Sequence, residues 1–417
     1  MKQNYNFDVD KIKNLSSEEK ISRKKYLNSF LETGFPGRRN EDWKFTDLNT
    51  IINKNFDKIT NDFEFNLNTK IKILQNFEHN YIVLTNGMLS SSNFDYEDKN
   101  KIEIKNFKGT ESDVQMIPNT LTLLNSALSL GGYSLKISEN YKFKKPLVIY
   151  NYFSENLKNV IFNNKNFIKL NKGTEITVIE YTVDTSQNNY IKNTLDNILL
   201  DNNAIFKSIF IQNSKSNGHF YRYIKTSLES NADFQNIILT SGLKFNKTEI
   251  EVNLNKEKSN CSILSALNIS KDEHQEIKTK INHYAPNCES YQKIKNVINE
   301  NGKGVYQGKI FVKEIAQKTN AYQLSKALIL DDKSEFDAKP ELEIYADDVK
   351  CSHGSTSGSI DKDAIHYLMT RGIDIKTAKQ LLINGFLNDI LDNFTDTNIK
   401  ELMQTTLEGQ INGHKKN

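Results

Sequence analysis

The segment EIEVNL at residues 249–254 places an apolar side chain at every second position, with acidic or amide side chains between them. The same alternation recurs in IKTSLE at 224–229, in IKTKIN at 277–282 and in ELEI at 341–344. Successive side chains of a β-strand point to opposite faces of its sheet. The period of two therefore predicts a series of strands that each bury one face.

Pairs of turn-forming residues separate the alternating segments, from about residue 160 to about residue 350. The first pairs lie about 26 to 30 residues apart and the later ones about 15 apart. They include Lys172–Gly173, Asn202–Asn203, Ser230–Asn231, Glu257–Lys258 and Pro286–Asn287. A fixed period with one pair of strands per repeat favours a β-solenoid, whose rungs bury their apolar faces against neighbouring rungs. An antiparallel β-sandwich is the alternative, although its turns recur at shorter intervals.

The N-terminal segment has a helical pattern. The first 35 residues predict a helical arm, because Ser16 and Glu19 fit a capping box and Gly34 suits the end of a helix. Directly after it, the charged segment GRRNEDWKFTDL at 37–48 contains the only tryptophan, Trp43. Two interpretations of this segment stay open: a solvated, salt-bridged turn that Trp43 anchors, or a surface that contacts a partner.

After residue 360 the hydrophobic period becomes helical. One helix is predicted to stop before Gly372, and a final helix is predicted over 395–409, ending near Gly409. Between them an apolar stripe recurs at three- and four-residue spacing, which indicates an amphipathic helix. The stripe includes Leu381, Leu382, Phe386 and Ile390. It either packs on the neighbouring helices or docks a partner.

The chain has 417 residues, of which 37% are apolar and 26% charged, and its net charge is +3. Together with the recurring strands, this composition argues against a disordered chain, and no clustered basic patch indicates nucleic acid. No apolar run reaches the length of a membrane span, and the N-terminal residues lack the apolar core of a secretory signal. The three cysteines, Cys261, Cys288 and Cys351, do not make a disulfide framework in so long a chain. We therefore expect a cytoplasmic protein that binds neither nucleic acid nor membrane.

Several segments imitate familiar sites without the required spacing. The glycines within 301–309 fit neither the phosphate-loop nor the dinucleotide pattern, so we expect this chain to bind no nucleotide. The segment 354–358 has the outline of a nucleophile elbow, but its central threonine favours a glycine-lined turn. The pairs Asp331–Asp332 and Asp347–Asp348 would suit a β-helix hydrolase or lyase, yet adjacent residues of a strand point to opposite faces.

Cys351 and His353 form the remaining candidate site, with one residue between them. In an extended segment this spacing puts both side chains on one face. Thiolate sulfur and neutral imidazole suit iron or zinc, but two ligands do not complete a structural zinc site. The pair is therefore either an inert cysteine beside a surface histidine or a half-site that a second chain completes.

The segment YADDVKCSHGSTSGSIDKDAIHYLMTRGI at 345–373 resembles the signature of the SufB/SufD family of iron–sulfur cluster assembly proteins. Five further segments resemble family motifs in the expected order: 37–48, 124–137, 283–295, 304–312 and 316–330. Within the family the sequence is most similar to the SufD branch, because residues 351–354 read CSHG. In addition, residues 324–336 lack the cysteine that is thought to receive sulfur in SufB.

The resemblance implies a mainly β fold, a right-handed parallel β-helix core with N-terminal and C-terminal α-helical regions. The expected parts are an N-terminal helical and mixed α/β region at 1–150, a β-helix core at 151–358 and a C-terminal helical domain at 359–417. The resemblance also implies a non-catalytic scaffold that pairs with a SufB-like paralogue and binds a SufC-like ABC-type ATPase. A homodimer is the alternative pairing.

By the same resemblance, His353 and Cys351 are ligands of a transient iron–sulfur cluster shared with SufB. His353 is favoured, since neutral imidazole binds iron without losing a proton. Leu381, Leu382, Phe386 and Ile390 are then the surface that docks the ATPase, and ATP-driven opening exposes the cluster ligands at the SufB–SufD interface. A cytoplasmic location is expected, with a plastid-type organelle as the alternative. The competing hypotheses are a stand-alone β-helix hydrolase or lyase and an inert structural solenoid.

Overall fold

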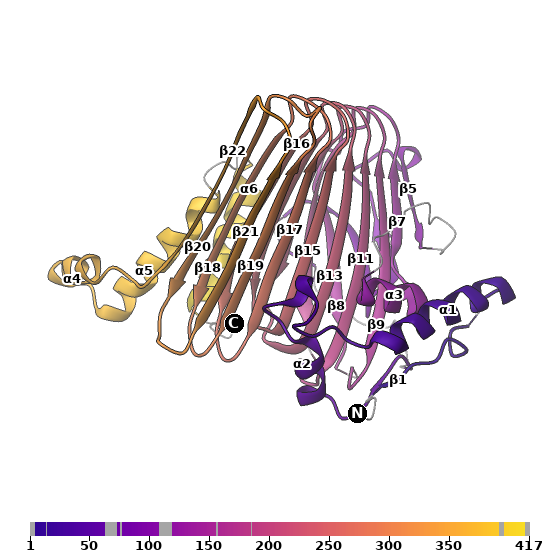
Figure 1. Cartoon of the computed structure of the whole chain (residues 1–417), viewed down its shortest axis with the longest axis horizontal. Coiled ribbons are helices and arrows are strands. Elements are labelled where there is room, and N and C mark those ends of the chain that lie inside the picture. Colours follow the sequence, from indigo (N-terminus) through magenta and orange to yellow (C-terminus); the bar gives the residue numbers. More distant parts are fainter. Residues whose placement is uncertain are drawn as a thin grey trace.

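A computed structural model describes residues 5–13, 15–62, 73–75, 77–107, 119–155, 157–184, 186–391 and 396–412. Most of these residues form a parallel β-solenoid with helices at both ends, which confirms the predicted fold class (Figure 1). Two segments of the N-terminal region, 63–72 and 108–118, lie outside the described residues.

Each rung of the solenoid contributes one strand to each of two sheets. Sheet 1 has the order β22-β20-β18-β16-β14-β12-β10-β8-β3-β4. Its strands are β3 (Asn80–Thr85), β4 (Met88–Asn93), β8 (Leu147–Phe153), β10 (Glu175–Asp184), β12 (Ile205–Gln212), β14 (Asp233–Ser241), β16 (Asn260–Ile269), β18 (Glu289–Ile298), β20 (Thr319–Ile329) and β22 (Val349–Gly358).

Sheet 2 has the order β21-β19-β17-β15-β13-β11-β9-β7-β5, and β6 also pairs with β9. Its strands are β5 (Ile102–Asn106), β6 (Ser129–Gly131), β7 (Tyr133–Ile137), β9 (Ile161–Leu170), β11 (Tyr190–Leu200), β13 (Ser216–Leu228), β15 (Leu243–Leu254), β17 (His274–His283), β19 (Lys303–Val312) and β21 (Glu335–Ile344). The pairs β3–β4 and β5–β7 are antiparallel, whereas the ladders between successive rungs are parallel.

The strand register confirms the predicted repeat. Ile161 of β9 pairs with Ile191 of β11, 30 residues later, and His219 of β13 pairs with Phe245 of β15, 26 residues later. The spacing of about 15 residues predicted farther along the chain is half a rung, because each rung has two strands and turns twice.

Residues with a left-handed backbone occupy the turns that the polar pairs predict. Asn203, Asn231 and Asn287 have φ values of 58°, 57° and 59°. Asparagine enters this region of φ/ψ space more readily than other residues with a side chain. The polar pairs therefore mark the corners at which the chain passes from one sheet to the other.

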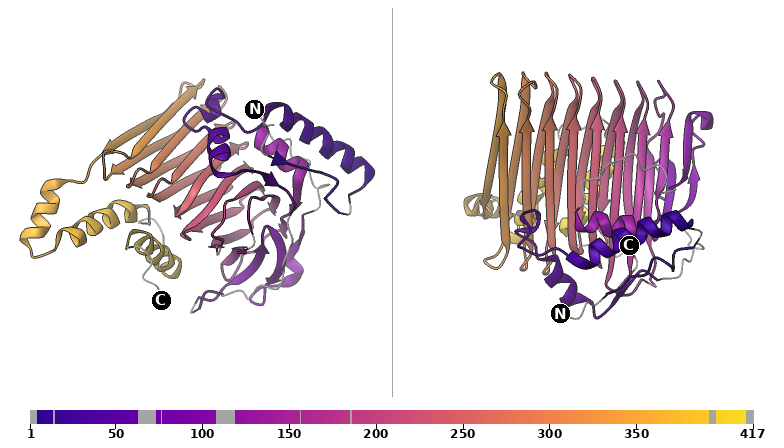
Figure 2. Two further views of the ribbon diagram at one scale, coloured as in Figure 1. Left: turned by 90° about the horizontal axis from the view of Figure 1, so that it is seen from below. Right: turned by 45° about the vertical axis from the view of Figure 1, so that its right-hand side comes forward.

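The inward faces of the two sheets form the main core. Ile224 and Ile250 pair in register on β13 and β15, and both belong to this core. Glu249, on the outer face of β15, is buried as well, although the alternation predicts an exposed residue there. The reason is that N-terminal elements lie over this part of sheet 2 (Figure 2).

The N-terminal helix α1 (Ser17–Thr33) starts at the predicted capping box and ends at Gly34, whose φ of 68° suits glycine. The short helix η1 (Glu41–Trp43), α2 (Leu48–Asn55) and α3 (Thr120–Leu128) lie along sheet 2 (Figures 1 and 2). The remaining N-terminal elements are β1 (Tyr5–Asn6), which pairs with β2 (Ile59–Thr60), and η2 (Lys99–Lys101).

The C-terminal elements are α4 (Lys362–Thr370), α5 (Ile375–Asn388), η3 (Asp389–Leu391) and α6 (Thr397–Asn412). Helices α5 and α6 pack on the outer face of sheet 1, and α4 projects away from the solenoid (Figure 2). The predicted helix end near Gly409 is wrong, because Gln410 hydrogen-bonds to Gln212 and Asn268 and thereby holds one more turn. None of the helices in the described ranges is long and apolar enough to cross a membrane.

Candidate functional site

The solenoid is open at its C-terminal end. Strand β22 is the last strand of sheet 1 and pairs with β20, while β21 is the last strand of sheet 2 and pairs with β19. Neither strand has a partner on its outer side among the residues that the structure describes. Such edges present unpaired backbone N–H and C=O groups to another strand. We call β21 and β22 the open end (Figure 1).

Cys351 and His353 both lie on β22 and face the inside of the solenoid. Their register partners on β20 are Ala321 and Gln323, which are buried in the interior. Because in-register residues of parallel strands share a face, the two candidate ligands also share one, as their spacing predicts. Cys351 is half-buried and His353 is exposed, since no further rung covers β22.

Cys351 packs against an apolar cluster that includes Ala321 and Ala346. Burial raises the pKa of this thiol, although a hydrogen bond from the Ala321 backbone opposes the effect. The thiol is therefore protonated at neutral pH, and a metal ion would have to displace that proton. This environment favours His353 over Cys351 as the donor that is ready to bind.

The two side chains do not make a complete metal site. Across the described ranges, no group of three or more His, Cys, Asp or Glu side chains is arranged to hold a metal ion. Any ion or cluster bound at the open end therefore requires donors beyond those that this described part of the chain supplies.

Cysteine alkylation tests this environment. We expect iodoacetamide to label Cys351 alone in the folded protein, because Cys261 and Cys288 are buried. The rate at pH 7.5 should be lower than for a solvated cysteine and should rise with pH, since only the thiolate reacts. Mass spectrometry gives the number and position of adducts. Cys351→Ser should remove the adduct, and labelling of two or three cysteines before unfolding would contradict the structure.

The apolar stripe of the C-terminal helix is divided between surface and interior. Leu381 is 48% exposed, whereas Ile390 is 1% exposed and packs in the core between the helices and sheet 1. Leu382 and Phe386 are half-buried. The structure therefore brings Ile390 into the interior and leaves Leu381 as the most accessible member of the stripe.

A polar junction fastens this helix to the solenoid, and no sequence pattern predicts it. Lys295 of β18 donates to the Phe386 carbonyl (2.6 Å), lies over the Phe386 ring (4.4 Å) and pairs with Asp389 (2.5 Å). Lys293 pairs with the same carboxylate at 2.9 Å. Movement of α5 and η3 is thus tied to a strand that lies two positions from β22.

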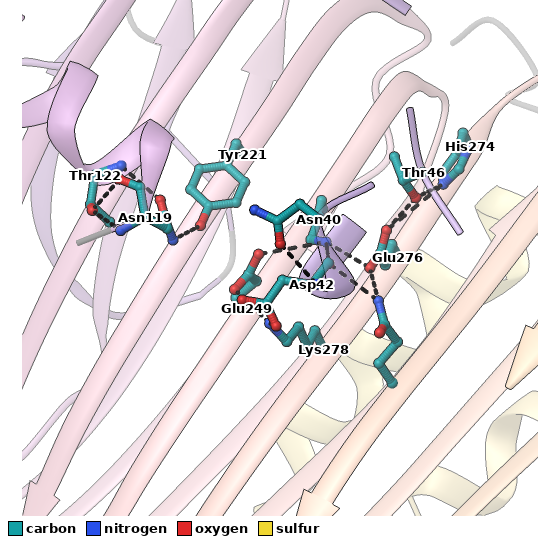
Figure 3. Close-up of polar contacts among 12 residues, drawn as sticks. Asn40, Asp42, Thr46, Asn119, Thr122, Tyr221, Glu249, His274, Glu276 and Lys278 are labelled. Atoms are coloured by element: carbon teal, nitrogen blue, oxygen red, sulfur yellow. Dashed lines mark hydrogen bonds and ion pairs between the residues drawn. The ribbon is translucent and has the colours of Figure 1, made fainter. Parts of the chain in front are cut away.

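The charged segment at 37–48 is a clamp across sheet 2, and we call it the N-terminal clamp. Trp43 is buried, as predicted for an anchor, and Lys247 of β15 lies 3.8 Å from its ring centroid. The Lys247 ammonium also donates to the Asp42 carbonyl (2.7 Å) and pairs with Glu276 of β17 (2.8 Å). Figure 3 shows Thr46 bound to the same carboxylate.

The acidic residues of the clamp reach toward the open end. Asp42 pairs with Lys278 of β17 at 2.7 Å, and Glu41 pairs with Lys339 of β21 at 2.5 Å. The salt bridges thus run to the solenoid, whereas Arg38 and Arg39 are exposed. The polar contacts of the clamp span β15 to β21 and are the main explanation for the many charged residues of the segment.

Residues 152–386 match the model of the SufBD core domain of the SUF system for FeS cluster assembly. The iron–sulfur cluster assembly protein SufD of Escherichia coli (strain K12) is 26% identical over 397 residues, which cover 93% of this chain and 92% of that protein. Protein ABCI7, chloroplastic, of Arabidopsis thaliana is 23% identical and covers 92% of this chain and 84% of its own length. The SufB protein of Bacillus subtilis (strain 168) is 25% identical over 297 residues, 70% of this chain and 63% of that protein.

Proposed function

The chain belongs to the SufBD core family of the SUF system for iron–sulfur cluster assembly, and we propose that it acts as a SufD-like, non-catalytic scaffold subunit. The observation that carries the proposal is the open end, where β22 holds a Cys-x-His pair and no other described strand covers the outer edges of β21 and β22. A scaffold needs such a surface, because it must present ligands to a cluster that another chain also holds. The parts proposed for this role are the β-helix core at 151–358 and the helical domain at 359–417, with 1–150 as the N-terminal region.

The partner proposed for the open end is a SufB-type chain of the same family. Its own solenoid would continue both sheets by strand addition to β21 and β22. His353 would then face the junction and supply an imidazole nitrogen to the nascent cluster, which is the cargo of the complex. Cys351 is the secondary candidate, since its thiol is partly buried and protonated. A homodimer through the same edges is the alternative assembly.

A SufC-type ABC ATPase is the partner proposed for the C-terminal helices. Leu381 on α5 is an exposed apolar side chain, as are Tyr367 and Met369 on α4. Helix α4 projects from the solenoid (Figure 2). ATP-dependent movement of this partner would pull α5 and, through the Lys295–Asp389 pair, β18 of sheet 1. The pull would shift the population toward an open scaffold in which the ligands are accessible.

The enzyme hypothesis has less support. The Asp331 carboxylate accepts hydrogen bonds from the backbone of Glu300, Lys333 and Ser334 and so fixes a turn. The hypothesis of an inert solenoid predicts that Cys351 and His353 can be lost without consequence. We propose a cytoplasmic location, with a plastid-type organelle as the alternative, by analogy with the bacterial and chloroplastic relatives.

Co-purification tests the assembly. The tagged chain is co-expressed with SufB-type and SufC-type proteins, and the recovered complex is analysed by light scattering and native mass spectrometry. We expect both partners to be recovered at a fixed ratio. Recovery of the chain alone, as a stable monomer, would overturn the scaffold proposal and favour an enzyme or an inert solenoid.

A single substitution tests the docking surface. Leu381→Asp should weaken binding of the ATPase at least tenfold, because it places a charge in an apolar contact. The matched control is Ile21→Asp on α1, since Ile21 is 71% exposed at the other end of the molecule. Affinity is measured by surface plasmon resonance with the complex immobilised through the SufB-type chain. Equal binding by both variants would exclude α5 as the docking helix.

A further inference from the structure

A small network of buried polar side chains lies in the interior near the open end. The Tyr306 hydroxyl of β19 lies 3.3 Å from Gln292 Oε1 on β18 and 3.2 Å from Gln323 Oε1 on β20. Thr279 Oγ1 lies 3.4 Å from the same hydroxyl. All four side chains are buried. Buried polar groups cost free energy unless they are paired, so a network of this kind in a core calls for an explanation.

The backbone makes room for this network. A Cβ atom on Gly308 would lie 2.2 Å from Tyr306 Oη and 2.4 Å from Gln323 Oε1. Any side chain at this position would collide with both atoms. The local sequence YQG at 306–308 therefore provides the hydroxyl together with the space that it occupies.

The network belongs to a column of in-register residues on sheet 1. The column runs from Ile263 to Gln292, then to Gln323, and ends at His353 on the open end. Farther from the edge the same register contains Ser208 and Asn236, so Ile263 is the apolar member between two polar stretches. Gln323 is thus the buried polar residue adjacent to His353, whereas Gln292 lies one rung deeper.

Contacts at both polar atoms orient the Gln323 carboxamide. Oε1 lies 3.2 Å from the Tyr306 hydroxyl, whose single proton it shares with Gln292 Oε1, and Nε2 donates to the Glu341 carbonyl of β21 at 3.4 Å. A carbonyl-type oxygen has two lone pairs, so Oε1 can accept a second hydrogen bond. A histidine that binds a metal usually donates its other ring N–H to such an oxygen.

We propose that Gln323 is a positioning residue for His353. Its Oε1 accepts the N–H of one imidazole nitrogen, so that the other nitrogen keeps its lone pair directed at the partner side of the open end. Tyr306 acts through Gln323, because its hydroxyl holds the carboxamide with the oxygen inward. The inference rests on the proposed function, in which His353 is a ligand of the cluster.

The test uses the purified complex with its SufB-type and SufC-type partners, titrated anaerobically with Co(II) as a spectroscopic substitute for Fe(II). Gln323→Met keeps a similar volume without the amide and should weaken Co(II) binding about tenfold, as loss of an outer hydrogen bond does at other metal sites. The visible absorption bands of the bound Co(II) should shift as well. The matched control, Gln292→Met, removes the other amide bound to Tyr306 and should change the affinity less than twofold.

Two further variants, Tyr306→Phe and His353→Ala, are titrated with Co(II) in the same way. Tyr306→Phe retains the ring and should give a partial loss of Co(II) affinity, and it replaces Gln323→Met if that variant does not fold. The melting temperature should fall only modestly in Gln323→Met, because the Glu341 carbonyl loses its donor while Tyr306 keeps Gln292 as an acceptor. His353→Ala reports on the ligand itself and should remove the Co(II) bands that depend on this chain.

Comparison of the variants distinguishes the positioning role of Gln323 from the proposed ligand role of His353. Normal Co(II) binding by Gln323→Met, together with loss in His353→Ala, would overturn the positioning role and leave the ligand role intact. Equal losses in Gln323→Met and Gln292→Met would attribute the effect to core packing and overturn the inference as well. Normal binding by His353→Ala would remove the proposed ligand role, and the positioning role with it.

Discussion

Replacing Arg222 by methionine is expected to lower the free energy of unfolding by about 3–5 kcal/mol. Arg222 lies in the interior of the solenoid, where its guanidinium pairs with Glu180 (2.5 Å) and with Asp196. Both carboxylates are buried. Methionine fills a similar volume but leaves the two negative charges without their main partner. Breaking a buried ion pair in this way costs far more than losing one on the surface.

The loss of stability in Arg222→Met should depend on pH, and the pKa of Asp196 determines the direction. Burial raises the pKa of Asp196, although Arg222 opposes it, and removal of Arg222 should raise that pKa further. A carboxyl group with a raised pKa in the folded state binds more protons folded than unfolded, so stability falls as the pH rises through this range. The loss in Arg222→Met should therefore be larger at pH 8 than at pH 5.

Urea unfolding at both pH values measures the loss. The remaining cation near the carboxylates is Lys192, whose pKa burial lowers to about 8, so it offsets only part of the lost charge. The control is the triple variant in which Glu180→Gln and Asp196→Asn accompany Arg222→Met, and it should recover most of the stability. An equal loss at the two pH values would show that packing, and not unpaired charge, determines the effect.

The solenoid could be predicted because its signals are local. Alternation in a segment such as 249–254 and turn residues such as Asn231 report on strands and corners within a single rung. The burial of Glu249 could not be predicted, because it depends on N-terminal residues that are distant in sequence. The hydrogen bond from Lys247 to the Asp42 carbonyl, for example, spans 205 positions.

The candidate site was predictable in part for the same reason. One intervening residue suffices to place Cys351 and His353 on one face of a strand. Their different exposure depends on the end of the solenoid, which pairing between rungs determines. The spacing of the apolar stripe likewise did not distinguish Ile390, which packs inward, from Leu381, because both positions satisfy a helical period.

Replacing Trp43 by alanine is expected to cost about 3–5 kcal/mol of stability, as large aromatic deletions in cores do. The indole is buried, stacks on Tyr221 with ring centroids 5.8 Å apart and lies under the Lys247 ammonium. Its loss would leave a cavity beneath a fully buried cation. Trp43→Phe retains an aromatic face for that cation and should lose considerably less.

Hydrogen exchange distinguishes a local effect of this substitution from a global one. The clamp also reaches β19, where Gln307 Nε2 lies 3.5 Å from the Asp42 carbonyl. If residues 37–48 clamp the rungs near the open end, Trp43→Ala should speed amide exchange in β15, β17 and β19 well before β8 and β10. Exchange in β21 should also rise, because the Glu41–Lys339 pair loses its support. A uniform increase along the whole solenoid would instead mean that the clamp stabilises the fold as a single unit. The edge strand of sheet 2 that we propose for partner pairing would then depend on the stability of the whole solenoid, and not on a local contact with the N-terminal segment.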